Sequence, residues 1–305
     1  MDLEILTRPP TLIPRWETEE WTARLATVLT STPYFSHQTL HQPIHHSLQS
    51  SSPPSTSSSS SPSSSRFRIL DICTGSGCIP LGLASALPPK SSHLIGIDIH
   101  EKAIQLATEN ETHNRALLRG NRVNFQRGDL MAPDAVDTFL RFSSPSQRQE
   151  QEQEQYHNNS SAATTTTRIP RATGYNLIIS NPPYISHSEF STLEPEVAQW
   201  EDPNALLADQ EGLIFYPRIA HMAMSLLHSN THAHHSSDEH NNSVSERQWR
   251  NGPDLDEVKV PELVFEIGGD HQVESVSKAA REAGFRRVQV WKDLADRSRC
   301  IIAAR

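Results

Sequence analysis

The chain has 305 residues and a formal net charge of −9, and its hydrophobic content of 35% is low because serine, threonine, glutamine and histidine occur in long tracts. The charge argues against a general nucleic-acid binder, which usually carries a basic face, and no apolar run approaches the roughly 20 residues of a membrane-spanning helix. The three cysteines, Cys73, Cys78 and Cys300, form no C-x-x-C pair, which predicts reduced thiols in an intracellular compartment.

The first 34 residues are predicted to form a turn and a helix that pack on the remainder of the chain. Residues 3–6 are apolar enough to be a short strand. Thr18 is expected to cap a helix, because apolar residues recur after it at helical spacing. These apolar residues are Trp21, Leu25, Val28 and Leu29.

Three stretches lack hydrophobic periodicity and are dominated by a few polar residue types. Residues 35–65 are rich in serine and proline, residues 143–173 in glutamine, glutamate and threonine, and residues 229–258 in histidine. Such segments bury too little apolar surface to offset the entropy of ordering them, so we predict three disordered insertions. Their histidines lack supporting cysteine or carboxylate spacing, so no metal site is assigned.

A glycine-rich turn follows the first predicted strand after residue 65. The turn is Cys73-Thr74-Gly75-Ser76-Gly77, and an apolar helix follows it. Strand, glycine turn and helix is the arrangement of dinucleotide-binding folds, in which Gly75 and Gly77 would let the backbone turn sharply and approach a ligand. Pro80 stands where the pyrophosphate-binding pattern has its third glycine, which favours a nucleoside ligand without a diphosphate.

Acidic residues follow the next two predicted strands. Asp98 lies roughly 20 positions beyond the glycine turn, where a carboxylate can accept both ribose hydroxyls, and Ile99 can flank an adenine. After the third strand, Asp129 can accept from the adenine exocyclic amine and Leu130 can cover the ring. A purely structural role for Asp98, as the cap of the following helix, is the alternative.

The most informative stretch is Asn181-Pro182-Pro183-Tyr184, directly after an apolar run at residues 175–180. The run is typical of a buried parallel strand, and the two prolines end it because neither has an N–H to donate. Ligands in open α/β sheets gather at the carboxyl ends of strands. We therefore expect an amide side chain, free backbone carbonyls and an aromatic ring at a site there; the alternative is a proline turn with Tyr184 as rim packing.

Strands alternate with helices through the remainder of the chain, which predicts an α/β fold with a doubly wound, mostly parallel sheet. Residues 194–209 are predicted as a loop over the site. The last two strands are joined by a connection too short for a crossover helix, which predicts an antiparallel C-terminal strand. The predicted strands cover residues 67–72, 93–97, 123–126, 175–180, 262–267, 285–291 and 299–303.

Taken together, these motifs resemble the class I S-adenosylmethionine-dependent methyltransferases. The set consists of Asp71 and the glycine turn, Asp98, Asp129 and the Asn-Pro-Pro-Tyr stretch, in that order. Residues 12–19, Leu-Ile-Pro-Arg-Trp-Glu-Thr-Glu, resemble the Leu-Ile-Pro-Arg-Pro-x-Thr-Glu signature of HemK-type release-factor glutamine methyltransferases, with Trp16 in place of a proline. The resemblance covers residues 1–34 and most of residues 66–305.

This resemblance implies a Rossmann-like catalytic domain at residues 66–305 that binds S-adenosylmethionine. It implies methylation of the glutamine amide in the Gly-Gly-Gln loop of a peptide-chain release factor. The Asn181 side chain and the Pro182 carbonyl would accept the amide hydrogens, Pro183 would keep the carbonyls out of the ladder, and Tyr184 would pack on the substrate. The implied cofactor-binding residues are Asp71, Cys73, Thr74, Gly75, Ser76, Gly77, Asp98, Ile99, Asp129, Leu130 and Asn181.

Two other functions stay open. The Asn-Pro-Pro-Tyr chemistry also suits methylation of a flipped adenine, although this acidic chain shows neither a basic groove nor a target-recognition domain. An inactive cofactor-binding partner protein is the second alternative, because the family's N-terminal helical domain does not precede residue 1. We expect a monomer without direct nucleic-acid or membrane contact, located in mitochondria with its presequence lost upstream, or alternatively in the cytoplasm.

Deleting residues 35–65, 143–173 and 229–258 and bridging each gap with a short linker should leave the melting temperature nearly unchanged. The reason is that all three lack core-forming periodicity and lie between elements, where insertions are tolerated. Thermal unfolding of the full chain and the triple deletion tests this expectation. Loss of solubility or a large fall in melting temperature would show that at least one segment is structural.

Overall fold

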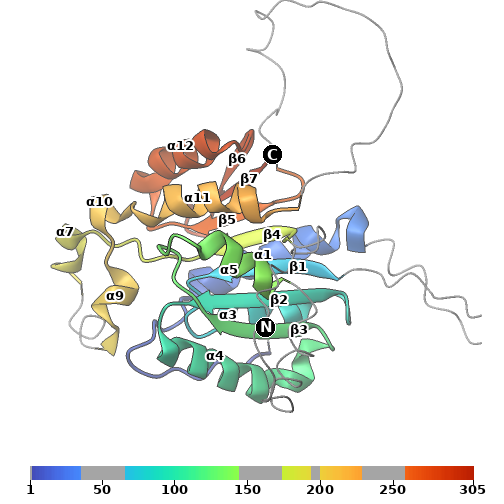
Figure 1. Cartoon of the computed structure of the whole chain (residues 1–305). Coiled ribbons are helices and arrows are strands. Elements are labelled where there is room, and N and C mark those ends of the chain that lie inside the picture. The colour runs from blue at the N-terminus through green and yellow to red at the C-terminus, as the bar shows by residue number, and fades with distance from the viewer. Residues whose placement is uncertain (1, 36–65, 144–173, 194–199, 229–257) are drawn as a thin grey trace, which may run out of the picture.

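The computed structural model describes residues 2–35, 66–143, 174–193, 200–228 and 258–305. The three predicted insertions lie outside these ranges except for their edge residues, so their disorder stays a prediction. Within the described ranges, a seven-stranded sheet lies between two layers of helices (Figure 1).

The sheet has the strand order β3-β2-β1-β4-β5-β7-β6. Strands β1 to β5 pair in parallel, and β7 is antiparallel to both of its neighbours. The prediction of a doubly wound, mostly parallel sheet with an antiparallel C-terminal strand is therefore confirmed. The strands are β1 (Phe67–Ile72), β2 (Ser92–Asp98), β3 (Arg122–Arg127), β4 (Leu177–Ser180), β5 (Leu263–Glu266), β6 (Arg287–Lys292) and β7 (Ser298–Ala304).

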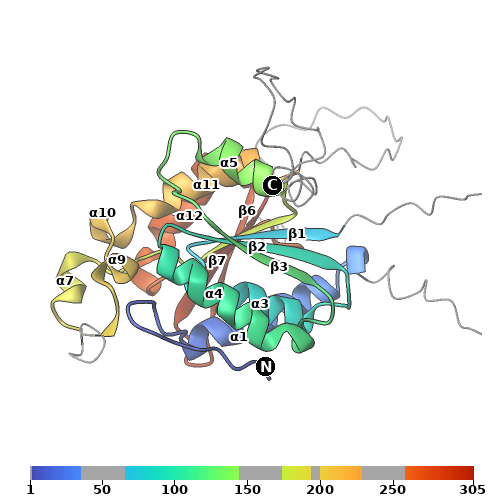
Figure 2. The same cartoon turned by 60° about the horizontal axis from the view of Figure 1, so that its bottom comes forward.

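Helices α1, α3 and α4 cover one face of the sheet, and α5, α11 and α12 cover the other (Figure 2). Both faces of β4 are buried, with Ile178 in one hydrophobic cluster and Leu177 and Ile179 in the other. A strand buried on both faces reads as a continuous apolar run, as observed for parallel sheets. The helices are α1 (Trp16–Thr30), α3 (Cys78–Ala86), α4 (Glu101–Asn114), α5 (Ala135–Phe142), α7 (His187–Phe190), α9 (Pro203–Leu206), α10 (Asp209–Gly212), α11 (Phe215–Leu226) and α12 (Val273–Ala283), with the 3-10 helices η1 (Arg115–Leu118) and η2 (Asp270–Gln272).

The chain reverses its direction of travel across the sheet after β3. Strand β1 pairs with β2 on one side and with β4 on the other. In such sheets the connections diverge at this point and leave a crevice at the carboxyl ends of the two central strands. That edge faces α7, α9 and α10, on the left of Figure 1.

The predicted strand at residues 3–6 is wrong. This segment lies along α4, where two asparagine side chains take the place of a neighbouring strand. Asn110 Oδ1 accepts from Leu6 N (2.8 Å) and Asn114 Oδ1 accepts from Glu4 N (3.0 Å), and both side-chain amides donate back to the carbonyls of the same two residues. Asparagines four residues apart share one face of a helix, so α4 satisfies the segment's backbone.

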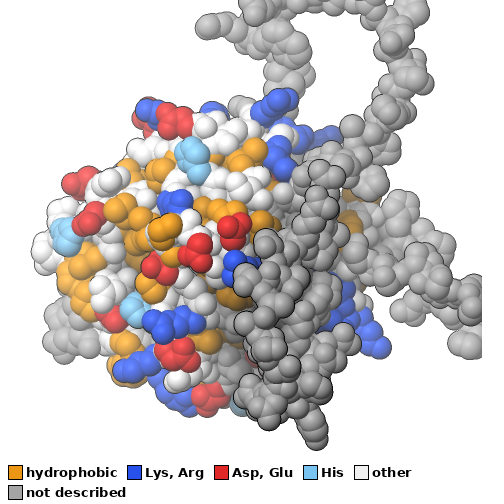
Figure 3. Space-filling view, in the orientation of Figure 1, with side chains coloured by type: hydrophobic (Ala, Val, Ile, Leu, Met, Phe, Trp, Pro, Cys, Tyr) orange, Lys and Arg blue, Asp and Glu red, His pale blue; other side chains and the backbone are white. Residues whose placement is uncertain are grey.

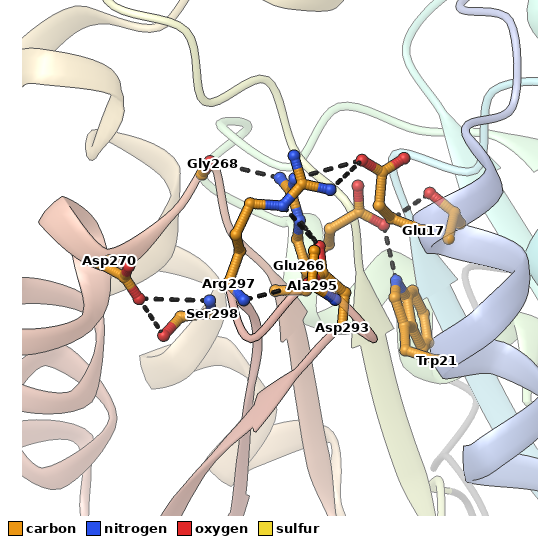
Figure 4. Close-up of polar contacts among 11 residues, drawn as sticks. Glu17, Trp21, Glu266, Gly268, Asp270, Asp293, Ala295, Arg297 and Ser298 are labelled. Atoms are coloured by element: carbon orange, nitrogen blue, oxygen red, sulfur yellow. Dashed lines mark hydrogen bonds and ion pairs between the residues drawn. The ribbon is translucent and has the colours of Figure 1, made fainter.

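Thr18 does not cap α1, which begins at Trp16 with Arg15 at the N-cap position. Thr18 is buried in the first turn, and its hydroxyl donates to Glu266 Oε2 (2.7 Å) at the end of β5. Trp21 Nε1 donates to the same oxygen (2.7 Å; Figure 4). Burial raises the pKa of Glu266, and the two hydrogen bonds only partly oppose this effect. Helix α1 is therefore attached to the sheet through a buried carboxyl group.

A second buried carboxylate, Asp293, organises the turn between β6 and β7 (Figure 4). It accepts from the backbone N–H groups of Ala295 (2.9 Å) and Arg297 (3.0 Å), and from Nε of Arg297 (2.9 Å) and Arg299 (3.0 Å). Arg299 also donates to Glu17 of α1 (3.1 Å). Burial alone would raise the pKa of Asp293, but these hydrogen bonds outweigh it and lower the pKa to about 2.

Asp293→Asn should therefore lower the free energy of unfolding at pH 7. A carboxylate whose folded pKa lies below its unfolded value of roughly 4 stabilises the fold above that value, and this stabilisation is lost as the pH falls towards 2. The difference between variant and wild type should thus shrink between about pH 4 and pH 2, as measured by urea unfolding at each pH. Asp296→Asn, in the same turn but exposed and ion-paired with Lys292 on the surface, is the control. A difference that stays constant with pH would contradict the prediction.

Candidate functional site

A cavity of about 750 Å³ lies at the carboxyl edge of the parallel strands. Its volume falls within the range of about 300–1,000 Å³ that is usual for small-molecule sites. Turns that follow β1, β2, β3 and β4 all contribute to its wall, as the topology requires. Eight of the predicted site residues line it: Cys73, Gly75, Asp98, Ile99, Asp129, Leu130, Asn181 and Pro183. Six do not: Asp71, Thr74, Ser76, Gly77, Pro182 and Tyr184.

The two glycines of the turn after β1 serve different purposes. Both have left-handed backbone conformations, with φ of +54° at Gly75 and +80° at Gly77. A Cβ at Gly75 would meet only Thr11 Cγ2, at 3.9 Å, so the space beside it is open to a ligand. A Cβ at Gly77 would lie 2.6 Å from the Phe125 ring. Gly77 therefore permits close packing against β3, and only Gly75 allows a ligand near the backbone.

Asp71 and Thr74 do not line the cavity, but their hydrogen bonds fix the shape of this turn. Thr74 Oγ1 donates to Asp71 Oδ2 (2.6 Å), and Thr74 N donates to the carbonyl of Ile97 in β2 (2.9 Å). Burial raises the pKa of Asp71 to about 8 despite the hydrogen bond from Thr74. Ser76 is also buried, and its carbonyl accepts from Asn110 of α4 (3.0 Å).

Asp98 joins the ends of β1 and β2. Its Oδ2 accepts from Gly75 N (3.0 Å) and its Oδ1 accepts from His100 N (2.9 Å). The N-cap of α4 is His100 and makes no side-chain cap, so the alternative role of Asp98 as the helix cap is wrong. Each carboxylate oxygen has a second lone pair, so the half-buried Asp98 retains the capacity to accept hydrogen bonds from a ligand in the cavity.

The loop after β3 brings Asp129 and Leu130 to the cavity. Asp129 is exposed and its Oδ1 accepts from Met131 N (2.7 Å), whereas Leu130 is buried. Arg218 of α11 holds the loop, because its Nε donates to the Leu130 carbonyl (3.1 Å) and its guanidinium also donates to the Ala132 carbonyl (3.0 Å). Sequence reasoning missed Arg218, since nothing local to it indicates a partner in another segment.

Strand β4 ends at Ser180, as predicted, and Asn181 follows it at the cavity wall. The Asn181 side chain has no hydrogen-bond partner within the described ranges. Ser180 Oγ donates to the Ile72 carbonyl at the end of β1 (2.7 Å), which ties the two strand ends together. The Tyr184 ring packs beside Gly268, where an added Cβ would lie 3.1 Å from Tyr184 Cδ2. Its expected packing on a substrate stays a prediction.

Two further segments contribute to the wall: residues 10–12, which sequence reasoning did not assign to the site, and residues 202–207, which belong to the loop predicted to lie over it. Pro10, Thr11 and Leu12 line the cavity, and so do Asp202, Asn204, Ala205 and Leu207 from the predicted loop, which contains the short helix α9. Buried Glu201 joins the two segments by accepting from Ile13 N (3.1 Å) and from Arg15 (2.8 Å). The Leu-Ile-Pro-Arg run at residues 12–15 was a sequence signal for the N-terminal segment. No local pattern, however, links that run to Glu201.

The described residues contain no group of three histidine, cysteine or acidic side chains placed to hold a metal ion. None of their helices is long and apolar enough to cross a membrane. On the face drawn in Figure 3, lysine and arginine side chains are scattered among acidic and hydrophobic ones.

Comparisons with known proteins identify relatives of this chain. Residues 63–181 match the family model described as a methyltransferase domain. The release factor glutamine methyltransferase of Fusobacterium nucleatum is 31% identical over 235 residues, which cover 77% of this chain and 46% of that protein. The probable MRF1 mitochondrial N(5)-glutamine methyltransferase mtq1 of Schizosaccharomyces pombe is 25% identical over 299 residues, or 96% of this chain and 68% of that protein.

The solved structure titled delta-N METTL16 MTase domain superposes with a TM-score of 0.50 and 11% sequence identity, covering 99% of this chain and 88% of that one. At this identity the likeness supports the fold alone. The chain spans about half the length of the bacterial relatives it matches: 46% of the Fusobacterium nucleatum protein and 58% of the release factor glutamine methyltransferase of Thermodesulfovibrio yellowstonii.

Asp98→Ala should weaken the binding of S-adenosylmethionine by roughly 1.5–3 kcal/mol, the usual contribution of hydrogen bonds to a charged group. The variant removes the acceptor that faces the cavity and also frees Gly75 N. Isothermal titration calorimetry measures the affinity, and Glu282→Ala on the exposed side of α12 is the control. An unchanged affinity would show that the assignment at the end of β2 is wrong.

Proposed function

We propose that this chain, which has the class I methyltransferase fold and resembles the release factor glutamine methyltransferases, transfers a methyl group from S-adenosylmethionine to a glutamine side chain of a peptide-chain release factor. The observation that carries the proposal is the place of Asn181. Its amide, which has no hydrogen-bond partner among the described residues, follows β4 at the wall of the cavity that the ends of β1, β2 and β3 line. The bacterial and yeast relatives named as glutamine methyltransferases support it.

The cavity fits a nucleoside-type cofactor. Gly75 leaves its backbone open to a ligand, and Asp98 presents carboxylate oxygens beside it. Ile99 is 48% exposed at the rim and Leu130 is buried in the wall, so apolar surface is available for an adenine. When bound, S-adenosylmethionine supplies an electrophilic methyl group on a sulfonium centre.

The residues at the end of β4 would orient the nucleophile. A glutamine amide nitrogen is a poor nucleophile because its lone pair is delocalised into the carbonyl group. Asn181 Oδ1, at the cavity wall, would accept one amide hydrogen, and the carbonyl of Pro182, which is buried next to Asn181 and does not itself line the cavity, would accept the other. The two hydrogen bonds would fix the nitrogen and direct its lone pair at the methyl group. Pro183 has no N–H to donate, so the strand cannot continue through it and the Pro182 carbonyl stays outside the β-ladder.

Neither the Cys73 thiol nor the Tyr184 phenol is set up as an anionic base. Burial raises the pKa of the Cys73 thiol and the pKa of the Tyr184 phenol. Both groups are therefore neutral at pH 7, and the proposed catalysis rests on orientation of the amide. Transfer would break the methyl–sulfur bond and form the nitrogen–methyl bond, and the strongly acidic nitrogen would then release its proton to water.

The proposal includes two further points: the methylated glutamine lies in the Gly-Gly-Gln loop of the release factor, and the protein acts in mitochondria. The fission yeast relative is named as a mitochondrial enzyme, which supports that location, and a cytoplasmic location is the alternative. Action as a monomer, without direct nucleic-acid contact, also stays a prediction.

Asn181→Ala should lower single-turnover methylation of purified release factor by about 10²–10³-fold, as is usual when one oriented group of a preorganised site is removed. The affinity for S-adenosylmethionine should change little, because Asn181 acts chiefly on the nucleophile in the transition state. Asn181→Asp keeps an acceptor but places a negative charge near the sulfonium. Asn124→Ala in β3 is the control.

Three outcomes separate the alternatives. Wild-type transfer by Asn181→Ala would mean that the end of β4 is a structural proline turn. Methylation of an adenine-containing oligonucleotide, but not of release factor, would favour the nucleic-acid alternative. Cofactor binding without transfer to either substrate would favour an inactive partner protein.

A further inference from the structure

The side chain of Gln272 forms a buried bridge between two backbone groups. Gln272 is 1% exposed and lies at the end of η2. Its Nε2 donates to the Tyr184 carbonyl (2.9 Å) and its Oε1 accepts from Gly268 N (2.9 Å). Both ends of the amide are matched by a partner of the correct kind, since a carbonyl only accepts and an N–H only donates. Gln272 therefore connects the end of β5 to the segment that follows Asn181-Pro182-Pro183.

The peptide unit between Tyr184 and Ile185 is held from both sides. Gln272 binds its carbonyl, and its N–H, from Ile185, donates to the Leu206 carbonyl (2.9 Å). On the other side of the loop, Ser180 is fixed in β4. The Asn-Pro-Pro tripeptide thus spans two anchors, and the rings of its two prolines restrict φ at two of its three residues. A displacement of either anchor is therefore taken up by a short segment with few free torsions, which includes Asn181.

Two glycines enclose the bridge. A Cβ at Gly212 would lie 2.0 Å from the Tyr184 carbonyl oxygen and 2.8 Å from Gln272 Nε2. A Cβ at Gly268 would lie 3.1 Å from the Tyr184 ring and 3.3 Å from Gln272 Oε1. Neither glycine leaves room for a side chain of its own, and the amide of Gln272 occupies the space beside the Tyr184 carbonyl. If that amide were removed, a buried acceptor would lose its partner.

We propose that Gln272 is a positioning residue, which sets the place of Asn181 by holding the Tyr184 carbonyl. This inference rests on the proposed function for its link to methyl transfer. Gln272 does not line the cavity, so it acts on the reaction only through the loop. Because a misplacement of about 1 Å can lower a rate by about 10²-fold, loss of the bridge should reduce transfer without weakening cofactor binding.

Gln272→Met retains the volume of the side chain and removes both hydrogen bonds. It should lower the single-turnover rate by about 10–100-fold and leave the affinity for S-adenosylmethionine within about twofold of wild type. Gln272→Glu supplies a pH signature. Its carboxylate can accept from Gly268 N but cannot donate to the Tyr184 carbonyl, whereas its protonated form can do both. The rate of Gln272→Glu relative to wild type should therefore rise as the pH is lowered from about 8 to 6.

The matched control is Gln289→Glu in β6, where the glutamine accepts from Val258 N (3.4 Å) away from the loop. Its rate relative to wild type should not depend on pH. Native groups on the elements around the bridge titrate in the variant and in wild type alike. Dividing the variant's rate by the wild-type rate at each pH therefore cancels their contribution. These groups are His187, Glu189, Asp209, Glu211, Glu266, Asp270, His271, Glu274 and Arg299.

Hydrogen–deuterium exchange of residues 181–186 gives a readout that does not depend on activity. Exchange in this segment should be faster in Gln272→Met than in wild type and unchanged in Gln289→Glu. Wild-type rates and wild-type exchange in Gln272→Met would overturn the inference, and so would a lower melting temperature with unchanged transfer. If wild-type protein fails to methylate release factor while the exchange difference is present, the positioning role stands and the proposed function falls.

Discussion

The site depends on the pairing of β1 with β4. Because the chain returns to the centre of the sheet after β3, the ends of four parallel strands open on one edge, and the connections diverge between β1 and β4. The Ser180 hydroxyl, which donates to the Ile72 carbonyl, reinforces this pairing where both strands end. The glycine turn and Asn181 thereby come to share one cavity although they are far apart in the sequence. Without this pairing they would be separate loops.

Buried acids attach the N-terminal segment to this frame. Glu201 binds Ile13 and Arg15, and Glu266 binds Thr18 and Trp21. Burying a carboxylate is unfavourable unless hydrogen bonds compensate it, and removing one partner leaves a poorly compensated charge. These contacts therefore specify how α1 and residues 10–12 sit against the cavity. The raised pKa of Glu266 shows that burial outweighs its hydrogen bonds, so ionisation of this group opposes folding.

The loops of the site are held by polar side chains, two of which, Arg218 and Gln272, do not line the cavity. Arg218 holds the loop after β3, Asp98 holds the glycine turn, and Gln272 holds the segment after Asn181. Each of these side chains binds backbone groups, which is how a rigid scaffold can give irregular segments a defined shape. The Asn181 side chain itself is left without a partner within the described ranges, as expected for a group available to a substrate.

The sequence by itself determined the fold class, the end of β4 at Ser180 and eight of the residues that line the cavity. These depend on local physics: continuous apolar runs that are typical of parallel strands buried on both faces, the missing N–H of proline and the carboxyl ends of parallel strands. The tertiary structure alone decided that Gly77 packs against Phe125, that Thr18 binds Glu266, and that residues 3–6 run beside the asparagines of α4. It alone revealed Glu201 and Gln272, because a hydrogen bond between distant segments leaves no periodic signal in either of them.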